Sequence, residues 1–221
     1  MATITAINPS KRAPQQASIR VGSKVVATLS IKSIAELGLT IGRQWNESLA
    51  TQVAEAALYD KALRAAMARL NRRAMTRQQL DDKLNRLDFA PAVRQRVLDR
   101  LTELALLNDE AIGRELIREI QLRNAAGSQL LQSKLLQQGL DRELVDRLVN
   151  EAISKCNPID DAMQLALGRI QSMRNLDWVT QKRRLWSLLA RRGYDPDTIE
   201  SSLQRLPASM QNDDDPQSSP L

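Results

Sequence analysis

The sequence predicts an all-α fold, a tandem array of three three-helix repeats that is elongated and curved, preceded by a short N-terminal segment resembling a β-hairpin. Three observations favour this fold. Aromatic residues make up only 3% of the 221 residues, so the core must consist mainly of Leu, Ile, Val, Ala and Met, which is typical of packed helices. From residue 47 onward, apolar residues recur at every third or fourth position. A similar helix junction also returns with a period of about 50 residues, which indicates stacked helical units.

The N-terminal part of the chain, residues 17–45, has a different pattern. Ile19 and Val21 alternate with polar residues, Gly22 and Ser23 favour a turn, and a second apolar run follows them. Two such runs around a short turn predict a β-hairpin. Because a lone hairpin is only marginally stable in water, we expect this one to pack against the helices.

The expected helices begin at residues that can cap a helix. Asn, Asp and Thr side chains accept hydrogen bonds from first-turn N–H groups, and proline is tolerated at the first helical position, where its missing N–H would have no partner. The expected N-caps are Asn46, Thr76, Asn108, Asp141, Asn157, Asp177 and Asp195. The prolines expected at first helical positions are Pro91, Pro158 and Pro196. Gly139 and Gly193 are expected to end helices.

Three helix junctions can be aligned with one another: Leu87-Asp88-Phe89, Gln138-Gly139-Leu140 and Arg192-Gly193-Tyr194. Their apolar third residues lie 51 and 54 positions apart. Each unit has an apolar face too wide to bury alone, so neighbouring units are expected to stack. The predicted division of the chain is a strand and turn segment with a lead-in helix at 17–53, followed by three-helix repeats 1 to 3 at 54–107, 108–156 and 157–206.

Both ends of the chain are expected to be disordered tails. Residues 1–16 hold two prolines and little apolar content. Residues 207–221 are acidic, with Asp213, Asp214 and Asp215 in a row. We interpret this acidic end as a solvated tail.

Nothing in the sequence predicts a membrane or secreted protein. No stretch approaches the roughly 20 apolar residues that a membrane-spanning helix needs, and no apolar run follows the first basic residues as in a secretory signal. The single cysteine, Cys156, cannot form an internal disulfide, which fits a reducing compartment. We therefore expect a cytoplasmic protein and, because no exposed apolar seam is evident, a monomer.

Chemistry typical of enzymes is missing from the sequence. Without histidine there is no His general base and no His metal ligand, and one cysteine cannot form a Cys-rich zinc site. No glycine-rich phosphate loop is present. Adjacent acids such as Asp81-Asp82 and Asp160-Asp161 point about 100° apart on a helix, so they are expected to be caps or solvated residues. We expect no enzymatic activity, no metal and no cofactor.

Basic residues gather in two clusters of a chain whose formal net charge is +6. The first cluster surrounds the first helix junction and comprises Arg64, Arg69, Arg72, Arg73 and Arg77. The second lies in 178–194, where no residue from Trp178 to Tyr194 is acidic, and comprises Lys182, Arg183, Arg184, Arg191 and Arg192. A helix there would turn Leu185, Trp186 and Leu189 away from the arginines. Such a face can pair with phosphates, pair with carboxylates of an acidic protein, or simply be solvated. Trp178 and Trp186 are expected in the core rather than stacked on nucleic-acid bases.

In order and spacing, several motifs resemble those of the RecX family. The stretch 73–84 (Arg-Ala-Met-Thr-Arg-Gln-Gln-Leu-Asp-Asp-Lys-Leu) is similar to its first-repeat signature, and 106–110 (Leu-Leu-Asn-Asp-Glu) resembles its junction into repeat 2. The stretch 191–194 (Arg-Arg-Gly-Tyr) is similar to the Arg-Gly-Phe that closes a helix of its repeat 3. The segment up to Trp45 resembles its short strand region, so the resemblance covers residues 18–206. The spaced glycines and leucines that fit the pattern of repeat 2 are Gly127, Leu131, Leu135, Gly139 and Leu140.

The chain also departs from the family pattern. Met75 stands where arginine is usual, Gln79 where Glu is usual, and Ile112-Gly113 where Phe-Ala is usual. In repeat 2, a typical Arg, Glu and Lys are replaced by Leu130, Lys134 and Gln138. The basic face of repeat 2 is therefore expected to be thinner.

The resemblance implies a regulatory protein that binds RecA–single-stranded DNA filaments and inhibits filament growth, ATP hydrolysis and strand exchange in DNA repair, recombination and the SOS response. It implies no cofactor, and direct DNA binding would be weak or indirect. From the residues alone, a basic helical nucleic-acid-binding module or a scaffold without a RecA partner stays open. The candidate filament contacts are Arg64, Arg69, Arg72, Arg73, Arg77, Lys83, Lys182, Arg183, Arg184, Arg191 and Arg192.

Overall fold

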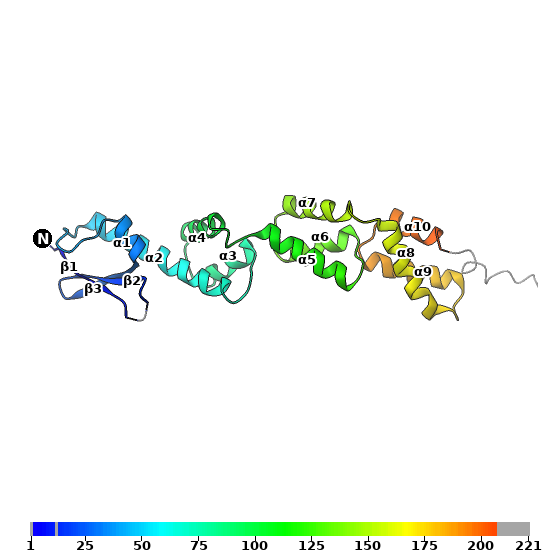
Figure 1. Cartoon of the computed structure of the whole chain (residues 1–221), viewed down its shortest axis with the longest axis horizontal. Coiled ribbons are helices and arrows are strands. Elements are labelled where there is room, and N and C mark those ends of the chain that lie inside the picture. The colour runs from blue at the N-terminus through cyan, green and yellow to red at the C-terminus, as the bar shows by residue number, and fades with distance from the viewer. Residues whose placement is uncertain (1, 12, 207–221) are drawn as a thin grey trace, which may run out of the picture. The chain divides into compact units, whose positions relative to one another are not determined.

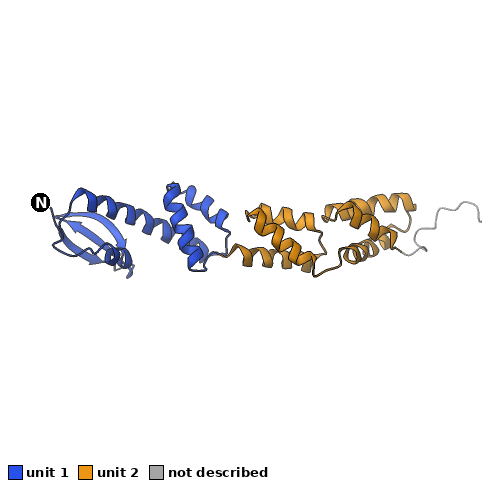
Figure 2. Ribbon diagram, turned by 90° about the horizontal axis from the view of Figure 1, so that it is seen from above, with its two compact units in different colours: residues 1–107 blue, residues 108–221 orange. Residues whose placement is uncertain are grey.

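The computed structural model describes residues 2–11 and 13–206 of the chain (Figure 1). The chain divides into two compact units, residues 1–107 and residues 108–221 (Figure 2). The expected acidic tail at 207–221 lies outside the described residues.

The first unit contains a small sheet followed by helices, and the described part of the second unit is helical, so the predicted mainly helical fold is confirmed. The elements of the first unit are β1 (Ile4–Pro9), β2 (Gln16–Val21), β3 (Lys24–Ser30), α1 (Ile31–Glu36), α2 (Glu47–Leu70), α3 (Arg77–Asn85) and α4 (Pro91–Glu103). The elements of the second unit are α5 (Asp109–Arg123), α6 (Ser128–Gln137), α7 (Arg142–Ile153), α8 (Pro158–Ile170), the 3-10 turn η1 (Gln171–Met173), α9 (Trp178–Arg191) and α10 (Pro196–Gln204).

The expected hairpin is confirmed, and it belongs to a three-stranded antiparallel sheet with the order β1-β2-β3. Its tight turn contains Gly22, whose φ of +60° favours glycine. The expectation that 1–16 form a disordered tail is wrong, because Ile4–Pro9 forms β1 and pairs with β2. Ile4 is 1% exposed, so this strand contributes to the core. Pro9 is tolerated because it ends a strand at the sheet edge, where its missing N–H breaks no ladder bond.

The sheet packs against α2, which begins at the expected cap, Asn46. Apolar residues of both elements form one core, among them Ile19 of β2 and Leu49 of α2. The buried carboxylate of Asp60 accepts hydrogen bonds from the Ser30 N–H (2.5 Å) and the Ser33 hydroxyl (2.9 Å), which fastens the end of β3 and the start of α1 to α2. The predicted boundary between residues 53 and 54 falls inside this unbroken helix, so one helix serves both the sheet and repeat 1.

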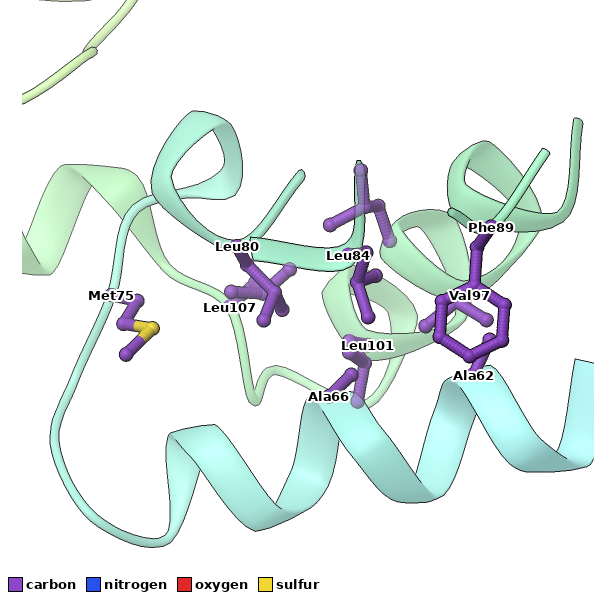
Figure 3. Packing of buried hydrophobic residues seen from close by; sticks show 10 residues of the cluster. Ala62, Ala66, Met75, Leu80, Leu84, Phe89, Val97, Leu101 and Leu107 are labelled. Carbon is purple, nitrogen blue, oxygen red and sulfur yellow. The ribbon is translucent and has the colours of Figure 1, made fainter. Parts of the chain in front are cut away.

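The core of repeat 1 lies between the second half of α2, α3 and α4 (Figure 3). Ala62 and Ala66 give α2 a narrow face, against which Leu80 and Leu84 of α3 and Leu101 of α4 pack with 0% exposure. Small residues on one helix and leucines on its neighbours allow the close, interdigitated packing typical of protein interiors.

Two further cores fill the described part of the second unit. The helices α5, α6 and α7 enclose one core, which includes Leu131 and Leu135. The helices α8, α9 and α10 enclose the other, which includes Leu185. Trp178 and Trp186 are partly buried against this second core, as the sequence predicts.

The three aligned junctions share one backbone conformation. Asp88, Gly139 and Gly193 each follow a helix with positive φ, at +58°, +80° and +80°. In the third junction the Gly193 N–H donates to Ala190 O (3.0 Å) and the Tyr194 N–H donates to Leu189 O (3.2 Å), and the other two junctions repeat this pattern. These hydrogen bonds define Schellman caps, so the predicted alignment is confirmed.

Repeats 2 and 3 touch each other backbone to backbone. The Gly127 N–H donates to Arg192 O at 2.9 Å, and the Gln129 N–H donates to Gly193 O at 3.1 Å. A Cβ at position 127 would lie 2.3 Å from Gly193 O, and a Cβ at position 193 would lie 2.2 Å from Leu130 N. Both glycines are therefore needed for these two repeats to stack at this distance.

Within residues 2–11 and 13–206, no helix combines the length and the apolar character needed to cross a membrane.

Candidate partner-binding surface

The first basic cluster surrounds the connection between α2 and α3. Arg64, Arg72 and Arg73 are exposed. The Arg69 side chain instead lies along its own helix, where Nη1 donates to Ala65 O at 2.7 Å. Arg72 and Arg73 therefore lie at the connection itself, whereas Arg64 lies earlier on α2, and these three face solvent.

Arg77 has a different environment from the rest of the first cluster. Its Nη2 donates to Asp99 Oδ1 at 2.5 Å, and its Nη1 donates to Thr102 Oγ1 at 3.1 Å. These contacts join α3 to α4 and compensate the charge of this arginine. Lys83, on the same helix, is half-buried.

The second basic cluster lies along α9, which has one buried apolar side and one exposed basic side, as the sequence predicts. Gln181, Leu185 and Leu189 are buried. The Gln181 side chain donates to the carbonyls of Met173 (3.0 Å) and Leu176 (2.7 Å), which fixes the start of α9 to the preceding turn. The exposed side carries Lys182, Arg183, Arg184 and Arg191.

A groove of about 510 Å³ lies beside this exposed side, between α8, η1 and α9. We call it the arginine groove, and its lining residues are Arg169, Ser172, Met173, Arg183, Arg184, Ser187, Leu188 and Arg191. Three of its arginines were predicted as site residues. Arg169 was missed, because no local sequence signal shows that the end of α8 faces the arginines of α9.

The arginine groove has an unusual charge balance. Four guanidinium groups and no carboxylate line it. Among the described residues, no ion pair within 4.0 Å involves Arg169, Arg183, Arg184 or Arg191. Guanidinium groups of like charge in one concave surface focus a positive potential, which attracts anions.

Arg192 lies apart from the arginine groove. It is half-buried and lines a neighbouring groove of about 530 Å³ that also contains Asp161, Gln164 and Arg169. The mixture of an acid with the two arginines makes this second groove a weaker anion site. The predicted arginines of repeat 3 are therefore divided between two grooves, with Arg183, Arg184 and Arg191 in one and Arg192 in the other.

The basic residues of repeat 2 are largely neutralised within the repeat. Glu110 of α5 accepts hydrogen bonds from Arg114 (2.7 Å) and from Arg147 of α7 (2.9 Å). Glu151 of α7 forms ion pairs with Arg114 (2.9 Å) and Lys155 (2.8 Å). Hydrogen bonds from Arg147 and then Arg114 lower the pKa of Glu110 to about 2, against an ordinary value of 4.5. This network joins α5 to α7 and leaves little free positive charge.

A larger groove of about 730 Å³ lies in the first unit, between α1, α2 and α4. Arg64 lines it together with acids that include Glu36 and Glu103. The Arg96 guanidinium stacks over the Tyr59 ring at 4.4 Å from its centroid, a cation–π contact that orders one wall. Because its charges are mixed, this groove fits an anionic partner less well than the arginine groove does.

Among residues 2–11 and 13–206, no group of three or more His, Cys, Asp or Glu side chains is placed to hold a metal ion. Cys156 is a free thiol on the surface.

One family model matches the chain. It is described as "RecX, first three-helix domain", and it matches residues 62–101, which cover the end of α2, α3 and most of α4.

Curated relatives match over longer stretches. The regulatory protein RecX of Clostridioides difficile (strain 630) is 24% identical over 93% of this chain and 96% of the relative. The regulatory protein RecX of Prosthecochloris aestuarii is 30% identical over 66% of this chain and 93% of the relative. That of Mycolicibacterium smegmatis is 32% identical over 61% and 73%, respectively.

Solved structures have the same fold. A crystal structure of regulatory protein RecX superposes with a TM-score of 0.78 at 19% identity, covering 92% of this chain and 100% of the other. The crystal structure of RecX from Lactobacillus salivarius gives a TM-score of 0.61 at 20% identity, covering 67% and 96%.

Proposed function

The chain belongs to the RecX family, and on that premise we propose that it binds RecA–single-stranded DNA filaments and inhibits the RecA recombinase in DNA repair and recombination. The relatives are named regulatory proteins, which supports a regulatory role. In this proposal the protein acts in the cytoplasm, by binding alone and without a cofactor, and slows filament growth, ATP hydrolysis and strand exchange.

The observation that carries the proposal is the arginine groove. Arg183, Arg184 and Arg191 of α9 and Arg169 of α8 offer planar donor groups that have no ion-pair partner within the described residues. A guanidinium group can donate two parallel hydrogen bonds to one carboxylate or one phosphate. The groove therefore suits a filament, whose surface presents protein carboxylates and DNA phosphates.

The first basic cluster would contribute a second contact. We propose that Arg64, Arg72 and Arg73, which are exposed, also face the filament. Arg77 would act differently, by holding α3 against α4 through Asp99, because its charge is already compensated. Four other predicted residues remain candidates of lower rank. Lys83 and Arg192 are half-buried, the Arg69 side chain donates to a carbonyl of its own helix, and Lys182 lies outside the lining of the arginine groove.

The test is the DNA-dependent ATPase rate of RecA from the same organism, measured with increasing amounts of this protein. We expect suppression at amounts well below one copy per RecA. For the same suppression of the ATPase rate, the variant Arg183→Glu/Arg184→Glu/Arg191→Glu should be needed at a concentration at least about tenfold higher. A loss of about 1.4 kcal/mol of charge-assisted contacts already weakens binding by that factor.

A matched control separates the groove from the net charge. Reversing Lys24, Lys61 and Arg142, which are exposed and outside both basic clusters, changes the charge by the same amount and should leave inhibition nearly intact. Circular dichroism and melting should show that both variants fold. No effect of the folded parent protein on RecA at any ratio would contradict the proposal.

A nucleic-acid-binding module without a RecA partner is a second candidate, favoured by the absence of carboxylates in the groove. It predicts tight binding to single-stranded DNA alone, with a log–log salt slope of about −0.7 for each phosphate contacted, and no change in the RecA ATPase rate. Weak DNA binding together with suppression of the ATPase favours the RecA proposal.

A further inference from the structure

The groove of about 730 Å³ in the first unit has an apolar floor, which α2 supplies. This helix runs from the sheet to repeat 1 (Figure 1). Tyr59, Leu63 and Met67 of α2 line the groove, and most of the other lining residues belong to α1 and α4. We call this concave surface the α2 groove.

The floor of the α2 groove is a stripe of large side chains that remains accessible. Because Tyr59, Leu63 and Met67 are four residues apart, they lie along one face of α2. Tyr59 and Leu63 are half-buried, and Met67 is 40% exposed. Apolar and aromatic side chains that line a concave surface together with a few polar groups are typical of a binding site.

Most charged groups around this stripe are compensated by neighbours. Lys32 and Glu36 of α1 form an ion pair at 3.6 Å, and Arg100 and Glu103 of α4 form another at 2.9 Å. Asp99 of α4 accepts from an arginine of α3 at 2.5 Å. These groups therefore contribute little net charge to the groove.

Asp60 is also satisfied, which leaves two guanidinium groups. The Asp60 carboxylate is 4% exposed and accepts from the Ser30 N–H and the Ser33 hydroxyl. In contrast, Arg64 of α2 and Arg96 of α4 line the groove and are exposed. Among the described residues, neither forms an ion pair within 4.0 Å.

One of these two cations is held in place beside the apolar stripe. The Arg96 guanidinium stacks over the Tyr59 ring at 4.4 Å from its centroid. A stacked guanidinium keeps the N–H groups at its edge available for a carboxylate. The α2 groove therefore combines an apolar floor with two uncompensated cations, and it is complementary to a ligand that is apolar on one side and acidic beside it.

We propose that the α2 groove binds an amphipathic helical segment of a partner protein. Its apolar side chains would cover Leu63 and Met67, and its carboxylates would pair with Arg64 and Arg96. A groove that accepts a partner helix takes apolar residues at helical spacing. The eight residue steps from Tyr59 to Met67 extend over about 12 Å, the length of about two turns of such a helix.

The composition of the groove favours a protein segment over other anionic partners. A nucleic-acid backbone would leave the apolar floor uncovered, and a flat lipid surface does not enter a concave groove. The inference does not depend on the proposed function, because it concerns the first unit and does not involve the arginine groove.

Three synthetic peptides test the proposal on the full chain. Each has about 14 residues, roughly four helical turns, with the same leucines at helical spacing and with Glu, Gln or Lys at the flanking positions. Binding is followed by the methyl resonance of Met67, which Met67→Leu assigns by removing it. The Glu peptide should shift this resonance saturably, and its affinity should exceed that of the Gln peptide by about three- to tenfold, because two exposed ion pairs are added. The Lys peptide should bind more weakly still.

A matched pair of variants tests the apolar floor, with the peptide-induced change in amide resonances of α4 as the readout. Met67→Glu should abolish binding of the Glu peptide, because it replaces an apolar contact with a like charge. Leu58→Glu is the control, since Leu58 is a 51% exposed apolar residue of the same helix outside the groove lining, and this variant should bind normally. Circular dichroism and melting should show that both variants fold.

A second pair of variants tests the two cations. Arg64→Gln/Arg96→Gln should bind the Glu and Gln peptides with equal affinity. Lys61→Gln/Arg86→Gln removes the same charge from exposed residues outside the groove lining and should keep the difference.

Four results would overturn the proposal. They are no saturable shift of the Met67 methyl with the Glu peptide up to about 1 mM, the weak end of specific affinity; equal affinities for the Glu and Lys peptides; binding that survives Met67→Glu; and binding that Leu58→Glu abolishes in a folded protein. Because neither RecA nor DNA is present, each outcome is independent of whether the protein inhibits the recombinase.

Discussion

The contact between repeats 2 and 3 makes the sharpest prediction about the fold, through the substitution Gly127→Ala. Gly127 has φ −77° and ψ 170°, an extended conformation that alanine adopts without strain. Only the added methyl group therefore matters. It would lie 2.3 Å from Gly193 O and 2.5 Å from Tyr194 N, both backbone atoms that cannot rotate away.

The expected loss of stability follows from what must move. Separating the two backbones breaks the hydrogen bonds from Gly127 N–H to Arg192 O and from Gln129 N–H to Gly193 O. Each such bond contributes about 1 kcal/mol net, and buried groups left without a partner cost about 1–3 kcal/mol more. We expect Gly127→Ala to lower the free energy of unfolding by about 2–4 kcal/mol, although alanine in an unstrained position would otherwise stabilise by about 0.4–1 kcal/mol.

The assay combines urea denaturation with amide hydrogen exchange. The Gln129 N–H should lose its protection in the variant. Gly22→Ala is the control for backbone strain alone, because Gly22 has positive φ and nothing within 4 Å of a Cβ. In the double variant Gly127→Ala/Gly193→Ala, the second change should cost only the left-handed strain of about 1–2 kcal/mol, because the contact is already broken. Unchanged stability and unchanged protection in Gly127→Ala would refute this reasoning.

Three further predictions concern single side chains. Asp88→Gly should stabilise repeat 1 by about 0.5–1 kcal/mol, because Asp88 occupies the left-handed position that glycine prefers, and a lower urea midpoint would contradict this. Tyr194→Phe should raise the free energy of unfolding by about 1 kcal/mol, because the buried Tyr194 hydroxyl has no hydrogen-bond partner among the described residues. A lower free energy of unfolding, measured by urea denaturation, would show that the hydroxyl has a partner. The pKa of Glu110, lowered to about 2 by Arg147 and Arg114, implies stability that is present above pH 4.5 and is lost as the pH falls toward 2. Glu110→Gln should flatten this acid dependence of the melting temperature, and an unchanged profile would show that the ion pairs do not form in solution.

The helix boundaries could be predicted because they depend on local chemistry. Asn46 and Asp177, for example, accept hydrogen bonds from first-turn N–H groups at 2.8 Å, as their residue types indicate. The glycines at 139 and 193 could be predicted as helix ends for the same reason, since a left-handed cap needs only the two preceding turns.

Features that depend on distant residues could not be predicted. The sequence does not predict β1, because Ile4–Pro9 is a short run that ends in a proline, and only its pairing with β2 makes it a strand. The long helix α2 hides the boundary between the sheet and repeat 1, because its two halves pack on different partners without a break. The sequence alone shows neither which strand pairs with which nor which face of a helix is covered.

The site residues show the same limit more clearly. The chain has 32 Lys and Arg residues. Sequence reasoning alone does not separate those that form ion pairs between helices from those that face solvent. Arg77, Arg94 and Arg147 each pair with a carboxylate of a neighbouring helix, so their charges stabilise the fold and are already compensated.

Arg184 and Arg191 look identical to those arginines in the sequence, but they line a groove without acids, so their charges are available to a partner. The distinction is geometric, because it depends on where α8 and the acids of other helices lie. It also explains why a modest net charge can support a strong local field, since compensation within repeat 2 leaves the positive potential on the arginine groove of repeat 3 and on the exposed arginines of repeat 1. An anionic partner, whether it presents carboxylates or phosphates, would therefore be expected to bind where several such arginines line one groove, as they do on repeat 3.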